Sequence, residues 1–277
     1  MPLDSAKIES MEKIAKQMRI DIVNMLHGVQ SGHPGGSLSA VEIMTDLYFN
    51  QMNIDPVNPK MQDRDRFVAS KGHCAPAVYV TLGEKGFFPK DELKGLRQLG
   101  SMLQGHPCMR KTPGIDMSTG SLGLGLSVGI GMGIAAKLDN KDYYTYVLLG
   151  DGEIQEGQIW EAAMSAVKFK TDNVIAILDN NGVQLDGTLE EIMPMGDIGK
   201  KFEAFGWNVI HADGHDFKSI DEAIEKAKST KGVPSIIIAK TVKGKGVSFM
   251  EGKNIWHGKP ISDEEFKTAM AELGGGK

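Results

Sequence analysis

The sequence predicts an α/β fold: a doubly wound, mostly parallel sheet with helices on both faces. Two observations predict it. Five short apolar segments of strand length are separated by segments with helical periodicity, and several of the strand segments are apolar throughout instead of alternating. Strands that alternate with helices form parallel sheets through right-handed crossovers. Ligands are therefore expected beyond the carboxyl ends of the strands, in the loops after 149, 178, 211 and 240.

The predicted strands are rich in β-branched or aromatic residues and lie at 66–69, 143–149, 174–178, 207–211 and 235–239. The first helix, at 8–29, has apolar residues at helical spacing with charges between them. Further helices are predicted at 41–52, 74–86, 121–138, 155–169, 197–205 and 216–229. No internal repeat, low-complexity stretch or linker marks a boundary, so residues 1–277 are expected to form a single domain.

Length, charge and cysteine content narrow the class of protein. The 277 residues can bury a large core, and the net charge of −5 argues against nucleic acid or an anionic membrane as the main partner. No apolar run is long enough to span a bilayer and no signal peptide is visible, so we expect a cytoplasmic protein. Cys74 and Cys108 each stand alone, which indicates a reducing compartment and excludes a zinc site built from cysteines.

Polar residues follow two of the predicted strands at the point where each strand ends. One strand runs into Gly-Asp-Gly at 150–152, and the next runs into Asp-Asn-Asn-Gly at 179–182. The glycines allow a sharp turn, and the N–H groups of the turn and of the following helix form an anion site. Asp151 can offer a carboxylate, Asn181 an amide oxygen and Val183 a backbone carbonyl to a hard cation such as Mg²⁺. Either motif alone is more simply an ordinary turn, but the two together favour a metal and diphosphate site.

These and other motifs together resemble the transketolase family. In the order of the family they are Ser31-Gly32-His33-Pro34-Gly35, Gly72-His73, Gly105-His106-Pro107, Thr119-Gly120-Ser121-Leu122-Gly123, Gly150-Asp151-Gly152, Gln155-Glu156-Gly157, Asn180-Asn181 and His257-Gly258. The resemblance runs from about Ala15 to Pro260. It implies the thiamine-diphosphate-binding fold, as its diphosphate-type domain, with thiamine diphosphate and Mg²⁺ or Ca²⁺ as cofactors. It also implies transfer of a two-carbon ketol unit between sugar phosphates (EC 2.2.1.1).

The resemblance also implies roles for individual residues. The metal ligands would be Asp151, Asn181 and the Val183 carbonyl. The cofactor would be bound by His73, Gly120, Leu122, Gly150, Asp151, Gly152, Glu156, Asn181, Leu185 and His257. Glu156 and Glu161 would lie at a dimer interface and couple protons between two cofactors, although acidic residues at a helix start are common for electrostatic reasons alone.

Four histidines lie beside glycine or proline in loops, namely His33, His73, His106 and His257. The resemblance implies that they face the bound sugar. Ketol transfer protonates and deprotonates oxygen atoms near neutral pH, where imidazole can both donate and accept. His27, near the C-terminal end of the first predicted helix, is expected to compensate the helix dipole, and His211 and His215 are expected to have structural or surface roles. The basic loop Lys-Gly-Lys-Gly at 243–246 is either a solvated turn or a loop that closes over a phosphate.

One further motif has the spacing of a dinucleotide-binding fingerprint. Residues 131–136 fit Gly-x-Gly-x-x-Ala, and Asp151 follows twenty residues after the first glycine. That fingerprint must follow directly on a strand, whereas the residues before this one belong to the helix predicted at 121–138. We therefore reject a dinucleotide site.

Complete enzymes of the family are more than twice as long as this chain. Their second domain supplies the glutamate that activates the aminopyrimidine ring and the residues that hold the sugar phosphate, and no segment here offers them. The chain thus resembles the N-terminal subunit of a split transketolase. It is expected to need a C-terminal partner subunit with the pyrimidine-binding domain, as two copies of each chain in a heterotetramer.

Two alternatives remain open. The chain could be half of a deoxyxylulose-phosphate synthase or of another ketol transferase, although the motifs at 105–107 and 256–260 favour transketolase. It could also be a non-catalytic protein that binds thiamine diphosphate, and the presence of Asp151, Asn181 and the four loop histidines argues against that.

Overall fold

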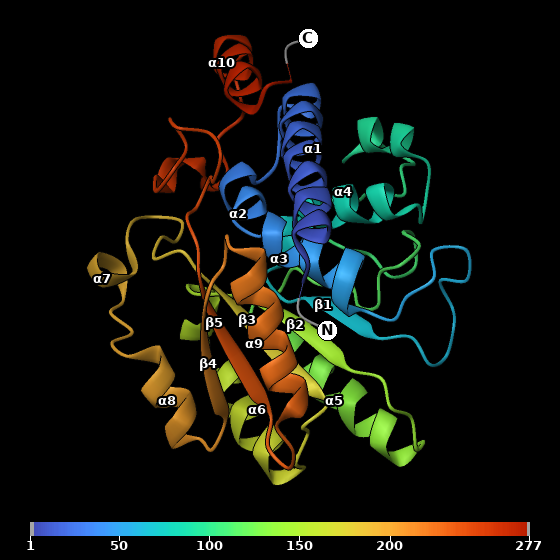
Figure 1. The fold of residues 1–277 in the computed structure, drawn as a ribbon. Helices are drawn as coiled ribbons and strands as arrows, with labels where there is room; N and C mark the ends of the chain where they lie inside the picture. The colour runs from blue at the N-terminus through green and yellow to red at the C-terminus, as the bar shows by residue number, and fades with distance from the viewer. Residues whose placement is uncertain (1–2, 276–277) are drawn as a thin grey trace.

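The centre of the protein is a five-stranded sheet in which every neighbouring pair of strands is parallel, in the order β1-β2-β3-β5-β4 (Figure 1). The structure is a computed structural model and describes residues 3–275. The strands are β1 (Arg66–Ala69), β2 (Thr145–Gly150), β3 (Val174–Asn180), β4 (Asn208–Asp213) and β5 (Ser235–Lys240). All five predicted strands are confirmed, with ends that shift by at most two residues.

Ten α-helices and five short helical turns surround the sheet in the described residues. The α-helices are α1 (Ser5–Val29), α2 (Pro34–Leu38), α3 (Val41–Asp46), α4 (Ala75–Lys85), α5 (Leu124–Leu138), α6 (Gly157–Lys168), α7 (Leu189–Ile192), α8 (Ile198–Ala204), α9 (Phe217–Ser229) and α10 (Asp263–Leu273). The turns are the π-helix η1 (Leu47–Gln51) and the 3₁₀ helices η2 (Gly72–Cys74), η3 (Lys90–Gly95), η4 (Glu153–Gln155) and η5 (Asn254–His257). None of the helices in residues 3–275 is long and apolar enough to cross a membrane.

Several helices differ from the sequence prediction, and the short helices α2 and α7 are absent from it. The helix expected at 121–138 begins at Leu124, because Gly123 precedes it with φ +83° in the left-handed region. The segment expected as a helix at 41–52 changes from α3 to the π-turn η1. Helix α10 is absent from the sequence prediction, although Ser262 and Glu265 form a capping box at its start.

Alternate residues of each strand point to opposite faces of the sheet, and each face carries its own core. One core joins strand residues such as Tyr146 and Ile175 to α1, α3, α4 and α9. The other joins Val147 and Ala176 to α5, α6 and α8. The crossover through α9 returns from β4 to β5, against the direction of the earlier crossovers, so a right-handed connection places α9 on the opposite face (Figure 1). This is the doubly wound arrangement that the sequence predicts.

Helix α5 packs directly against the sheet through glycines that face the strands. A Cβ atom added at Gly129 or Gly133 would collide with Val147 on β2 or Val174 on β3. One at Gly125 would collide with Ser70, just beyond β1. The Gly-x-Gly pattern at 131–136 lies inside this helix and not after a strand, so the rejection of a dinucleotide fingerprint is confirmed.

Candidate functional site

The turns after β2 and β3 leave the sheet side by side, because Gly150 pairs with Asp179 in the register of the two strands. Asp151 is buried, and its Oδ1 accepts the N–H of Gly152 at 2.8 Å while its Oδ2 accepts the N–H of Gly182. The second bond ties the first turn to the second. The two strand ends therefore converge as the sequence predicts.

Asn181 is held by its own turn. Its Oδ1 accepts the N–H of Val183 at 3.1 Å, and its Nδ2 lies 3.3 Å from Asp179 Oδ1. Asp151, Asn181 and Val183 line one cavity of about 300 Å³ at the carboxyl ends of the strands.

The cavity collects most of the predicted site residues. Those in its lining are His73, Leu122, Gly150, Asp151, Gly152, Glu156, Asn181, Val183, Leu185 and His257. The further lining residues are Gly36, Lys71, Glu153, Gln155, Gln184 and Lys243. His33, His106 and Gly120 lie beside the cavity, whereas Glu161 is exposed on α6 and does not line it.

The negative charge of Asp151 favours the binding of a cation in the cavity. Burial raises the pKa of its carboxyl group and the negative charge of Asp179 raises it further, to about 6, against the hydrogen bonds from Gly182 and Gly152. A cation beside the carboxylate would offset this cost. One carboxylate, one amide oxygen and one carbonyl form a donor set that suits a hard divalent ion with room for other ligands. The residues therefore fit the metal and diphosphate that the sequence leads us to expect.

A fully buried ion pair between Lys71 and Asp179 stabilises the site. The two side chains are 2% and 0% exposed, and Lys71 Nζ also donates to the Gly36 carbonyl at 3.0 Å. Asp179 accepts further hydrogen bonds from the hydroxyls of Ser39 and Thr241. Burial alone would lower the pKa of Lys71, but the charge of Asp179 outweighs it, so the pKa is raised. The only sequence signal for Lys71 is its place beside Gly72-His73, after a buried strand.

Glu153 connects three loops of the site, and sequence reasoning missed it. Its Oε1 accepts the Ser70 hydroxyl and the N–H of Gly123 at 2.9 Å, and its Oε2 accepts the N–H of Gly150 at 3.0 Å. Burial raises the pKa of this carboxyl group despite those three donors. Its one sequence signal is its position two residues after Asp151.

Lys243 enters the cavity from the loop after β5. It is 2% exposed, and its Nζ donates to the carbonyls of Val183 at 3.0 Å and Gln184 at 3.2 Å. The same nitrogen lies 3.1 Å from His257 Nδ1. Burial lowers the pKa of Lys243 to about 8, with the positive charge of Lys71 acting in the same direction. The solvated-turn interpretation of the loop at 243–246 is therefore wrong for Lys243.

The four loop histidines form one cluster. The ring centroid of His33 lies 5.4 Å from His73, 6.4 Å from His106 and 5.3 Å from His257, and His73 lies 5.0 Å from His257. His33 belongs to the loop before α2, and its buried Nδ1 has no hydrogen-bond partner among the described residues. The structure thus brings together histidines from four separate loops.

All four imidazoles are neutral at pH 7. Burial lowers the pKa of His33 to about 4, with Arg97 adding to the shift, and lowers that of His257 to about 3, with Lys243 adding to it. The pKa of His73 lies well below its usual value for the same reason, and that of His106 is also lowered. Neutral imidazoles can each donate and accept one hydrogen bond, so the cluster offers polarity without charge.

The mouth of the cavity is partly apolar. Leu122 and Leu185 line it and are 37% and 57% exposed. Gly120, with φ +142°, packs against His106 so closely that a Cβ atom would lie 3.1 Å from the imidazole. Glu156, also exposed, precedes α6 at the same opening. These features leave a surface open to solvent beside the expected cofactor position.

Outside the cavity, the remaining histidines differ from one another. His27 stacks on Phe266 and lies 2.8 Å from Asp263, so it joins α1 to α10. His211 is exposed on β4. His215 is hydrogen-bonded to Glu42. His27 lies in the last turn of α1, where a residue that compensates the helix dipole is expected, and the positions of His211 and His215 agree with structural or surface roles.

The chain is similar to proteins of one family over nearly its full length. Residues 10–276 match the family model described as transketolase, thiamine diphosphate binding domain. An apulose-4-phosphate transketolase subunit of Phocaeicola vulgatus is 43% identical over 267 residues, covering 96% of this chain and 95% of that protein. The 6-deoxy-6-sulfo-D-fructose transketolase subunit SqwG of a Clostridium species is 49% identical over 242 residues, covering 87% and 88%.

Longer relatives match over part of their length. Human transketolase is 41% identical over 271 residues, which are 98% of this chain and 43% of that protein. The crystal structure of transketolase from Campylobacter jejuni superposes with a TM-score of 0.91 at 34% identity, and this chain covers 43% of it. The fold is therefore the α/β thiamine-diphosphate-binding fold. The motifs in the loops, the geometry of the cavity and these likenesses agree, and the chain belongs to the transketolase family, as its N-terminal, thiamine diphosphate binding part.

Proposed function

We propose that this chain is the N-terminal subunit of a two-chain transketolase. It would transfer a two-carbon ketol unit from a ketose phosphate to an aldose phosphate, with thiamine diphosphate and Mg²⁺, and only together with a C-terminal partner subunit. Residues 1–277 would act as a single domain within an assembly of two copies of each chain. One observation carries the proposal: Asp151, Asn181 and the Val183 carbonyl line the same cavity as His73 and His257, in a chain that matches the thiamine diphosphate binding domain of the family.

In this proposal Asp151, Asn181 and Val183 hold the metal ion, and Gly152 borders the diphosphate. Lys243 Nζ donates to the Val183 carbonyl in the structure, so it has to yield that oxygen when the metal binds. Gly120, Leu122 and Leu185 would border the thiazolium and pyrimidine rings. Thiamine diphosphate, when bound, would supply the carbon that forms a carbanion, and the protein would supply the position of the cofactor.

The histidine cluster would serve the proton transfers. His33, His73, His106 and His257 are neutral at pH 7, so each can donate a hydrogen bond to one substrate oxygen and accept one from another. His33, His73 and His257 are partly buried, which limits the access of water to these three rings, whereas His106 is exposed. The apolar cavity mouth supports a partner subunit, since a pyrimidine-binding domain placed there would cover Leu122 and Leu185.

The substrate class rests on the relatives. Two of them are named for apulose 4-phosphate and for 6-deoxy-6-sulfo-D-fructose, so the reaction is shared while the anionic end of the sugar differs between them. We propose a ketose with a terminal phosphate as the donor. A ketose with a terminal sulfonate is the second candidate, because the relative named for it is 49% identical over its matched region.

Metal-dependent cofactor binding is the first test. Calorimetric titration of thiamine diphosphate should show binding with Mg²⁺ and its loss with a chelator. Asp151→Ala and Asn181→Ala should each abolish that binding while circular dichroism stays unchanged. Asp186→Ala is a matched control, because Asp186 is exposed and is not among the residues that line the cavity. Unchanged affinity in both site variants would refute the metal assignment.

Ketol transfer is the second test. The purified chain alone should show no turnover with a pentulose phosphate donor and an aldose phosphate acceptor, and mixing it with a polypeptide that carries the pyrimidine-binding and C-terminal domains should produce activity. Substantial turnover by the chain alone would refute the two-chain proposal. Cofactor binding without ketol transfer in any mixture would favour the non-catalytic alternative, and turnover only with a sulfonated ketose would favour the second substrate class.

A further inference from the structure

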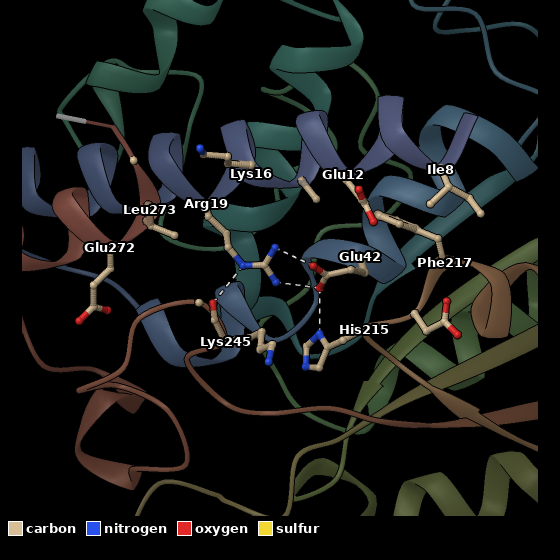
Figure 2. Close-up of a pocket in the computed structure, with 14 residues that line it drawn as sticks. Ile8, Glu12, Lys16, Arg19, Glu42, His215, Phe217, Lys245, Glu272 and Leu273 are labelled. Carbon is tan, nitrogen blue, oxygen red and sulfur yellow. Dashed lines mark hydrogen bonds and ion pairs between the residues drawn. The ribbon is translucent and has the colours of Figure 1, made fainter. Parts of the chain in front are cut away.

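A buried cluster of charged and polar side chains lies behind the loop that carries Lys243. Arg19 comes from α1, Glu42 from α3 and His215 from the loop between β4 and α9, and they line a hollow of about 660 Å³ (Figure 2). Arg19 and Glu42 are buried, and His215 is mostly buried. None of the three lines the cofactor cavity.

The three side chains converge on the carboxylate of Glu42. Arg19 Nη1 lies 2.6 Å from Oε1 and Arg19 Nη2 donates to Oε2 at 2.7 Å, while His215 Nδ1 lies 2.9 Å from Oε2 (Figure 2). Burial alone would raise the pKa of Glu42, but the hydrogen bond from His215 and the charge of Arg19 outweigh it and lower the pKa to about 2. Glu42 is therefore ionised at every pH at which the protein would work.

The outer ends of the cluster bind the backbone of one loop. His215 Nε2 accepts the N–H of Val242 at 2.9 Å, so the ring proton is on Nδ1 and is donated to Glu42. Arg19 Nε donates to the carbonyl of Lys245 at 3.0 Å. These two anchors flank Lys243 on either side. The N–H of Gly244, between them, donates to the Gly35 carbonyl at 2.9 Å.

The loop fits against Arg19 without spare room. Gly246 has φ +93°, and a Cβ atom there would lie 2.9 Å from Arg19 Cδ and 3.0 Å from its Nε. All three nitrogens of the Arg19 guanidinium have acceptors within the protein, and both oxygens of Glu42 have donors. The polar groups of the cluster are thus hydrogen-bonded within the protein. Outside the cluster they bind one loop, and these contacts do not indicate a ligand in the hollow.

We propose that Arg19, Glu42 and His215 are positioning residues, which hold the loop at 242–246 so that the ammonium group of Lys243 stays in the cofactor cavity. Glu42 never touches that cavity, and its effect reaches it through two hydrogen bonds to the loop backbone. Where it concerns cofactor binding, this inference rests on the function proposed above. The link to loop order stands independently of it.

Glu42→Gln is the first variant to make, since it keeps the shape of the side chain and removes its charge. Hydrogen exchange of the cofactor-free chain should show amides at 242–246 exchanging at least about tenfold faster, with β2 and β3 unchanged. Affinity for thiamine diphosphate with Mg²⁺ should fall about tenfold, a typical loss when a residue that orients a binding group is changed. Glu12→Gln is the matched control, because Glu12 is exposed on α1 and lines the same hollow.

Two variants of His215 separate positioning from general packing. His215→Gln keeps an acceptor near the Nε2 position for the N–H of Val242, whereas His215→Asn keeps only a donor toward Glu42. The Gln variant should preserve slow exchange at 242–246, and the Asn variant should lose it. Equal behaviour of the two variants would overturn the assigned role of His215.

A double-mutant cycle tests whether Glu42 acts through Lys243. In a Lys243→Met background, Glu42→Gln should cause no further loss of cofactor affinity, because the group that it positions is already absent. Fully additive losses, or unchanged exchange at 242–246 in Glu42→Gln, would overturn the inference. If Glu42→Gln fails to fold, the two His215 variants decide the matter. If the wild-type chain binds no cofactor while the loop responds as expected, the proposed function fails and the positioning role stands.

Discussion

Asp46 is a buried carboxyl group whose ionisation should limit the stability of the protein. It ends α3, its Oδ1 accepts Asn50 Nδ2 at 3.0 Å, and its Oδ2 has no partner among the described residues. Asn50 Nδ2 also donates to Asp221 Oδ1 at 2.8 Å, so a second carboxylate lies close by. Burial raises the pKa of Asp46, the hydrogen bond from Asn50 opposes this, and the charge of Asp221 raises the pKa further, from 3.8 to about 7.

The sign of the effect on folding follows from that pKa. Between about pH 4 and pH 7 the folded protein keeps a proton that the unfolded chain releases, so the free energy of unfolding falls as the pH rises through this window. At 1.36 kcal/mol for each pH unit, the loss at pH 8 is at most about 4 kcal/mol. Asp46→Asn keeps the Oδ1 acceptor and cannot ionise. At pH 8 it should therefore be about 2–4 kcal/mol more stable than the wild type, and at pH 4 the two should be nearly equal.

Urea unfolding followed by tryptophan fluorescence at pH 4.5, 6 and 8 measures this difference. Asp142→Asn is the matched control, because Asp142 is exposed and its stability effect should be small at every pH. A difference between Asp46→Asn and wild type that does not change with pH would refute the reasoning. So would a variant that is less stable than the wild type at pH 8.

Three further predictions concern the site. In the two-chain enzyme, His73→Ala and His257→Ala should each lower kcat/KM or cofactor affinity about tenfold to a hundredfold, because each removes a donor worth about 1.5–3 kcal/mol; wild-type kinetics would contradict their placement. Lys71→Met should cost about 3–5 kcal/mol of unfolding free energy in urea titrations, since it leaves Asp179 buried without its partner; a change below about 1 kcal/mol would count against the pair. Cofactor affinity in Mg²⁺ titrations should fall as the pH drops below about 6, where Asp151 gains a proton, and a flat profile from pH 5 to 8 would contradict the assignment.

The strands could be predicted from the sequence because their signal is local. Buried strands such as 174–178 are continuous apolar runs, and the turn residues that end them mark the site edge. The short helix α2 could not be predicted in this way. It has five residues, two of them glycine, and all five are buried. Its conformation therefore depends on tertiary packing and not on helix propensity.

The residues of the site likewise include some with a local sequence signal and some without one. The metal-ligand set at Asp151 and Asn181 and the loop histidines carry readable motifs, whereas the buried charges beneath them do not. Lys71 and Asp179 are 108 residues apart in the chain, and nothing local indicates that each neutralises the other. The basic loop marks Lys243 in the sequence but does not reveal its position, since its burial depends on carbonyl groups about 60 residues earlier. Such pairings become visible only in three dimensions.

The glycines of α5 act as a spacer between this helix and the sheet, with consequences for mutagenesis far from any ligand. Gly125, Gly129 and Gly133 fix how closely the helix approaches the sheet, and the helix begins one residue after Gly123. A single methyl group at Gly129 would push the helix outward and shift the loop that carries Leu122, because the loop and the helix are continuous. Screens for altered cofactor or substrate use should therefore recover changes on the buried side of α5. Such variants would behave as altered loop geometry, and a shift of this loop would also disturb the hydrogen bond from the N–H of Gly123 to Glu153.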